Sequence, residues 1–210
     1  YWLRLPATQR RTTLLVAAPT SLGLLAIFFA ETAGVAQTTA GNAAFLVSLC
    51  LLLTPGVEWA WLGRRPAGRL WLAALISLLG TWLLTGLAAE GINAGDALML
   101  LAALIRAFQT CLTTHLLRHQ HVDSLGLTAA PGLMVRSGAL AVLAVLSPAG
   151  HLPPLPTSPT FWGAITYLTV LCTVFAFWAM NRALGRSSPT QVALLLGSEP
   201  LWGALFAVFW

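Results

Sequence analysis

Long apolar runs follow one another along this 210-residue sequence, and each is long enough to cross a lipid bilayer. A membrane-spanning helix needs about 17–25 mostly apolar residues. Because the runs are unbroken and do not alternate with period two, they predict helices and not the strands of a membrane barrel. The seven expected spans are residues 12–33, 42–63, 70–88, 96–118, 125–146, 160–183 and 189–210.

The composition supports a membrane protein. Charged residues make up 8% of the chain and apolar residues 58%, whereas soluble domains carry roughly 25% charged residues. A soluble protein of this size would expose a large apolar surface. We therefore predict an all-α, polytopic helical membrane protein. The sequence has no phosphate-binding loop, nucleophile motif or zinc-protease motif, so we expect no enzyme activity, no cofactor and no metal.

The arginines predict the orientation of the spans. All 11 basic residues are arginine, and all except Arg106 and Arg136 lie on one side of the expected zigzag. The links on the other side, 33–41, 89–95 and 147–159, contain none. The positive-inside rule places the arginine-bearing side in the cytoplasm, which predicts a multi-pass protein of the cell (inner or plasma) membrane, with lipid around it. The arginines are too dispersed for nucleic acid to be a partner.

A weak internal repeat emerges when the chain is shifted by 149 residues, which lays the segment from Phe29 over the segment from Trp178. In each copy a helix ends, a link rich in Thr and Ser follows, and an amide opens the next helix. That amide is Asn42 in the first copy and Gln191 in the second. The first link has no arginine and the second has two, so the copies are expected to cross the membrane in opposite directions. Inverted repeats of this kind are typical of secondary transporters, with the substrate site near the midplane.

Three stretches carry motifs of a known family. They are TTAGNAAFLVSLCLLLTPGVEWAWLGRRP at 38–66, GDALMLLAALIRA at 95–107 and NRALGRSSPTQVALLLGSEPLWGALFA at 181–207. These stretches resemble the first-repeat motif, the start of the second half and the second-repeat motif of EamA-type transporters in the drug/metabolite transporter superfamily. The resemblance implies an inverted-repeat bundle of ten helices, of which this chain would contain the third to the ninth. Residues 1–94 would end the first repeat, and 95–210 would form an incomplete second one.

The same resemblance implies a secondary transporter, a permease that moves small organic metabolites such as amino acids or related solutes by alternating access. A small-molecule solute is then the expected partner, and a homodimer is left open. We expect the seven spans not to function without the remaining helices. The alternative is a non-transporting membrane scaffold or a membrane-embedded enzyme. Substrate, direction and coupling ion stay open.

Arg106 and Arg136 lie within the expected spans, where a charged side chain costs at least about 2.5–3.5 kcal/mol and therefore marks a functional site by default. Glu199 lies at a similar depth. The commonest arrangement would pair Glu199 with one arginine. A second possibility leaves one arginine free to bind an anionic group such as a carboxylate, which suits its planar fork. A third is an arginine that extends toward the lipid interface.

Seven residues are our candidates for contact with a solute. Gln109 and Thr110 follow Arg106 at helical spacing, which places them near it on one helix. For Asn42 and Gln191 the alternative is helix capping or hydrogen bonding between helices. The full set is Asn42, Arg106, Gln109, Thr110, Tyr167, Gln191 and Glu199.

Two further acids have other expected roles. Glu58 lies near the cytoplasmic end of its span and could pair with Arg64 or Arg65, as a structural contact. Glu31 lies near the external end of the first span. It is either a solvated residue or an acid that couples transport to protons.

Overall fold

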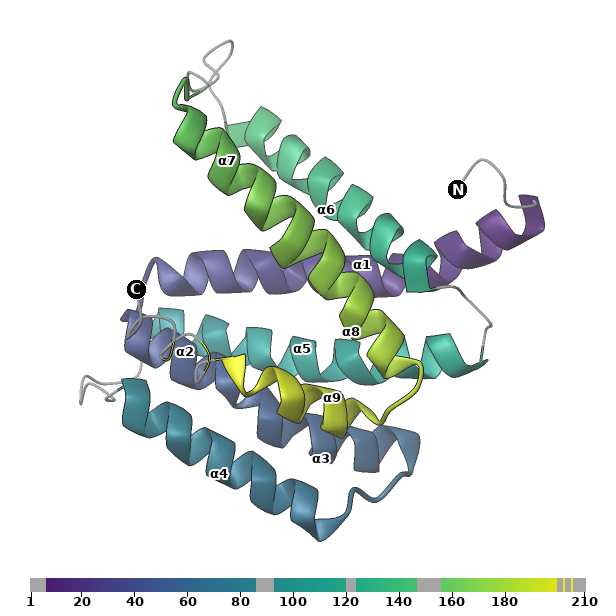
Figure 1. Ribbon diagram of the computed structural model, residues 1–210, viewed down its shortest axis with the longest axis vertical. Helices are drawn as coiled ribbons and strands as arrows, with labels where there is room; N and C mark the ends of the chain where they lie inside the picture. Colours follow the sequence, from purple (N-terminus) through teal and green to yellow (C-terminus); the bar gives the residue numbers. More distant parts are fainter. Residues whose placement is uncertain are drawn as a thin grey trace.

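The computed structural model describes residues 7–85, 93–119, 124–146, 156–199, 202 and 205, and every regular element within these ranges is a helix (Figure 1). In chain order the elements are α1 (Ala7–Val35), α2 (Ala40–Ser48), α3 (Cys50–Leu62), α4 (Gly68–Thr85), α5 (Ala94–His119), α6 (Ser124–Leu146), α7 (Pro159–Tyr167), the π-helix η2 (Leu168–Phe175), α8 (Ala176–Leu184) and α9 (Pro189–Leu196).

These elements confirm a polytopic helical membrane protein. Four stretches are long and apolar enough to cross a bilayer, namely Ala17–Val35, Ala40–Leu62, Ala94–Arg118 and Pro159–Leu184. Two shorter apolar helices, Gly68–Leu83 and Pro131–Leu143, overlap the third and fifth predicted spans. α9 opens the seventh predicted span, most of whose second half lies outside the described residues.

Helix α5 lies in the middle of the bundle, between α1 on one side and α2 and α3 on the other (Figure 1). The face that it buries is built from small side chains: Ala102, Ala103, Ala107 and Cys111 are each 0% exposed. Small residues let membrane helices approach closely, and packing between such faces drives their association. Where α1 ends against the start of α5, a Cβ on Gly95 would lie 2.8 Å from the carbonyl oxygen of Gly34, so only glycine fits there.

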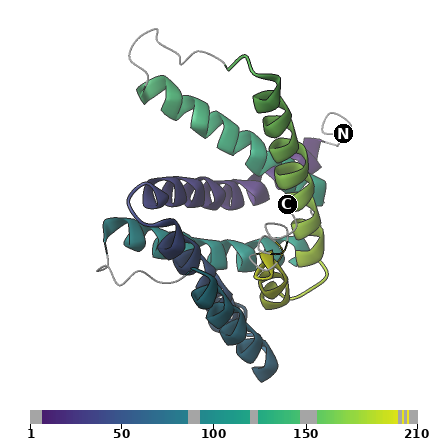
Figure 2. The ribbon, with the colours of Figure 1, turned by 60° about the vertical axis from the view of Figure 1, so that its left-hand side comes forward.

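Helix α1 is held on two sides. It packs against α5 on one side and against α6 on the other, and α6 in turn contacts α8. Figure 2 shows α6 and the continuous α7–η2–α8 helix diverging from the rest of the bundle, with α1 between α6 and α5. Helices α1, α5, α6 and α8 therefore form one packed group, since α5 also contacts α8.

The helices of the two copies of the repeat begin and end at corresponding positions in the sequence. α1 ends at Val35 and α8 at Leu184, while α2 begins at Ala40 and α9 at Pro189, so both pairs are 149 residues apart. The link from α1 to α2 and the link from α8 to α9 lie at opposite ends of the bundle (Figure 1). The copies therefore run in opposite directions, as an inverted repeat requires.

The helix starts in the two copies share one local structure. Thr39 and Ser188 are the N-caps of α2 and α9, and both have φ −74° and ψ 151°. The two hydroxyls accept hydrogen bonds from the backbone N–H groups of Asn42 and Gln191, respectively. These caps replace helix bonds that the first turn lacks. The division of the chain into repeats at residue 94 stays a prediction.

Candidate functional site

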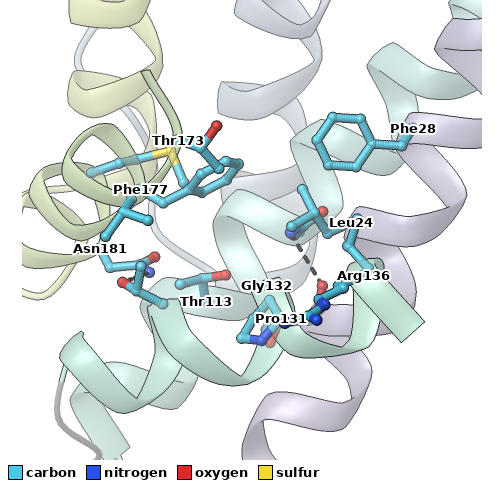
Figure 3. Close-up of a pocket in the computed structure, with 15 residues that line it drawn as sticks. Leu24, Phe28, Thr113, Pro131, Gly132, Arg136, Thr173, Phe177 and Asn181 are labelled. Atoms are coloured by element: carbon cyan, nitrogen blue, oxygen red, sulfur yellow. Dashed lines mark hydrogen bonds between the residues drawn. The ribbon is translucent and has the colours of Figure 1, made fainter. Parts of the chain in front are cut away.

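A cavity of about 260 Å³ lies between α1, α5, α6 and the η2–α8 segment. Its volume is close to the lower end of the range for small-molecule pockets, about 300–1,000 Å³. Figure 3 shows Leu24, Phe28 and Arg136 on one side of this space and Phe177 and Asn181 on the other. The apolar part of the wall comes from Leu24, Phe28, Pro131, Val135, Val174, Phe177 and Met180.

Gln109 is a polar residue of the cavity wall, and one end of its side-chain amide forms a hydrogen bond while the other end does not. Its Nε2 donates to the backbone carbonyl of Thr20 on α1, at 3.2 Å (Figure 3). Because that carbonyl can only accept, the bond fixes the orientation of the amide. The other end, Oε1, is buried and has no hydrogen-bond donor among the described residues.

Asn181 and Thr128 form a second polar contact at the cavity. Asn181 Nδ2 on α8 donates to Thr128 Oγ1 on α6 at 3.1 Å, and the Asn181 side chain is nearly fully buried. Thr113 on α5 lines the same space. Helical spacing after Arg106 predicts Thr113 on the same face as Gln109, but the sequence pattern did not single out Asn181 or Thr128.

The two arginines within the spans have different surroundings. Arg106 on α5 donates through Nη2 to Glu31 Oε1 on α1 and forms an ion pair there. Arg136 on α6 lines the cavity and is an exposed residue. Among the described residues no carboxylate pairs with Arg136, since the single ion pair found in them is that of Arg106 with Glu31.

The expected pair between Glu199 and an arginine is therefore wrong. Glu199 forms no ion pair within the described chain. The reason is lateral packing: α1 lies along α5, and this brings Glu31 directly beside Arg106. Depth along a helix does not specify which neighbour a side chain faces.

Comparisons with known proteins agree with this architecture. Residues 93–210 match the EamA-like transporter family. The chain belongs to this family. It is 31% identical over 116 residues to an uncharacterized transporter of Archaeoglobus fulgidus, an alignment that covers 55% of this chain and 38% of that protein. A protein of known crystal structure shares the fold, with a TM-score of 0.80 at 18% identity over 99% of this chain and 69% of that one.

The family confirms the resemblance expected from the motifs, and together with the apolar helices it supports a multi-pass membrane protein. The chain spans about two-fifths of the length of the archaeal relative, because the aligned segment covers 38% of it. At 18% identity, the solved structure supports the fold alone.

In this member of the EamA-like transporter family, Gln109 is the one predicted site residue among those that line the described cavity. Thr110 donates its hydroxyl to the carbonyl of Arg106 in its own helix, at 2.8 Å. Tyr167 is 58% exposed at the end of α7, and Glu199 is exposed after α9. The structure thus does not bring the predicted site residues together.

The two repeat-related amides differ. Gln191 completes a capping box with Ser188, because its Oε1 accepts from the Ser188 N–H at 3.2 Å. This is the capping role that was the alternative for it. Asn42 is 6% exposed, and its Oδ1 has no donor among the described residues. It lies outside the cavity lining.

Glu58 forms no ion pair with Arg64 or Arg65, contrary to expectation. Its Oε2 accepts from the Thr190 hydroxyl at 2.5 Å and from the Thr190 backbone N–H at 3.2 Å, and the side chain is 3% exposed. A carboxylate is favourable at this position because it faces the N-terminus of α9. Arg65 instead lies over the Trp59 ring, 5.9 Å from its centroid.

The π-helix η2 contributes Thr173 and Val174 to the cavity. The Thr173 hydroxyl donates to the carbonyl of Leu168, five residues back, at 2.9 Å. Short π-helical segments inside α-helices occur often at functional sites. No proline or glycine interrupts η2, so no residue pattern predicts it.

Proposed function

We propose that this protein is a secondary transporter, a permease that carries small organic metabolites across the cell membrane by alternating access, with the cavity as its solute site. The cavity carries the proposal. It lies between helices of both inverted copies, where transporters of this architecture bind their substrates. Its wall combines an apolar surface with a few polar groups, which is typical of small-molecule sites.

Two hydrogen-bonded contacts at opposite ends of the bundle suit such a mechanism. At one end, the Thr38 hydroxyl after α1 donates to Asp96 Oδ1 at the start of α5, at 2.5 Å. At the other end, Glu58 near the end of α3 accepts from Thr190 at the start of α9. Each contact joins a helix of the first copy to one of the second. Alternate opening of the two contacts would expose the cavity to one side of the membrane at a time.

The test is solute flux through the full-length protein in proteoliposomes. We expect uptake of at least one solute from a panel of amino acids and related organic acids, with and without an imposed proton gradient. Gln109→Leu should reduce this uptake, because it removes a polar group of the cavity wall. Gln37→Leu is the matched control, since Gln37 is exposed and bonds within its own helix turn, to the carbonyl of Ala33.

Absence of flux for every solute would contradict the proposal. So would equal flux in the wild type and in Gln109→Leu together with a loss in Gln37→Leu. A scaffold without transport predicts that cavity residues tolerate apolar replacement.

A further inference from the structure

We infer that Arg136 binds the carboxylate of a singly charged organic acid within the cavity, and that the site prefers such acids to amines of the same size. This inference names a substrate class for the proposed transporter and so rests on that proposal. The inference rests on a guanidinium that has no ion pair among the described residues and lies beside an apolar wall.

The two arginines within the spans differ in whether an acidic side chain neutralises them. A cation within a membrane span is costly and normally has a partner. Arg106 has one, because Glu31 neutralises it. Arg136 has no ion pair or hydrogen bond to the described part of the chain, yet it lines the cavity. A solute anion in the cavity would supply the missing partner.

The charge on the cavity wall indicates that the solute carries a negative charge. The charged group among its lining residues is Arg136, and none of the described lining residues is acidic. An ammonium group in this space would therefore meet a like charge and no counter-ion. A carboxylate would meet the planar fork of a guanidinium, which binds two carboxylate oxygens with two parallel N–H bonds.

The apolar side chains of the wall and the cavity volume indicate what the remainder of the solute is like. Leu24 and Phe28 lie on the same side of the space as Arg136, and Phe177 lies across from it (Figure 3). These side chains favour an apolar body attached to the acid group. Since one arginine provides one positive charge, a dianionic phosphate would keep one charge uncompensated. A volume of about 260 Å³ suits a small metabolite.

Binding to the full-length protein in nanodiscs tests the inference directly. The probes are phenylacetate, its neutral isostere phenylacetamide, the cation phenethylamine and the dianion phenyl phosphate. We expect phenylacetate to bind at least about tenfold more tightly than the other three, since hydrogen bonds to charged groups are the strong ones. Arg136→Gln should remove the preference for the acid over the amide, and Arg136→Lys should keep part of it.

The matched control is Arg186→Gln, which removes an exposed arginine in the link between α8 and α9. It should leave the preference for the acid unchanged. Equal binding of acid and amide to the wild type would overturn the inference, and so would tighter binding of phenyl phosphate. The wild-type comparison decides the matter even if Arg136→Gln fails to fold.

Flux of the same probes separates the two proposals. Phenylacetate binding that depends on Arg136 without any flux would contradict transport and leave the anion site in place. Flux of other solutes without any preference for phenylacetate over phenylacetamide would contradict the anion site and leave transport in place.

Discussion

Arg106 and Arg136 are two arginines at similar expected depth in the membrane, and the structure gives them different surroundings. Arg106 is paired with Glu31. On α5 it lies one helical turn before Gln109, and on α1 its partner lies one turn after Phe28, so the pair adjoins the cavity without lining it. Arg136 lines the cavity and has no ion pair with any described residue. The side chain on the neighbouring helix, and not depth in the membrane, therefore decides whether a charge in a span is structural or available to a ligand.

Reversal of one charge in the pair should have the largest effect. Glu31→Arg would place two cations in contact within the membrane, and we expect a loss of at least about 3 kcal/mol in the free energy of unfolding. Thermal unfolding in detergent would measure it. The double variant with Arg106→Glu restores opposite charges and should recover most of the loss. Failure of this rescue would mean that the pair is not what holds α1 to α5 at this point.

Removal of each arginine should separate the two roles. Arg106→Leu leaves the Glu31 carboxylate unpaired, and we expect it to destabilise the fold by about 1–3 kcal/mol. Arg136→Leu removes a cation without a partner, so thermal stability should stay unchanged or rise. Equal destabilisation by both substitutions would show that Arg136 also has a structural partner.

Glu58 differs from both arginines, because among the described residues hydrogen bonds from Thr190, and not an opposite charge, satisfy it. Glu58→Gln keeps the shape but removes the negative charge that faces Thr190 and the start of α9. We expect a loss of about 1–2 kcal/mol in the free energy of unfolding, typical of a charge-assisted hydrogen bond. A matched exposed acid, Glu199→Gln, should change stability by less than about 0.5 kcal/mol.

The smallest effect should come from a change that alters no charge. A Cβ at Gly23 would lie 3.3 Å from Gln109 Oε1, so Gly23→Ala should shift the amide by a few tenths of an ångström. We expect a modest reduction of solute binding without loss of stability, because small displacements in a site weaken its contacts. An unchanged affinity would indicate that Gln109 does not help to shape the site.

Much of the fold could be predicted from the sequence. Apolar runs locate the spans, because a bilayer accepts little else across its thickness. The shift of 149 residues correctly relates the N-caps Thr39 and Ser188, because capping is a local interaction encoded within one turn.

The site was less predictable. Whether Arg106 pairs with Glu31 or with Glu199 depends on how helices pack side by side, and no local pattern encodes that. The contact of Glu58 with Thr190 joins residues 132 positions apart. The contact of Asn181 with Thr128 could not be predicted for a similar reason, since the two residues are 53 positions apart.

An experimental structure of the full-length protein with phenylacetate bound would test most directly whether Arg136 binds a carboxylate. We predict the carboxylate oxygens at about 2.7–2.9 Å from the guanidinium nitrogens of Arg136, with Arg106 still paired to Glu31. A carboxylate bound to Arg106, or a ligand bound outside the cavity, would contradict the account.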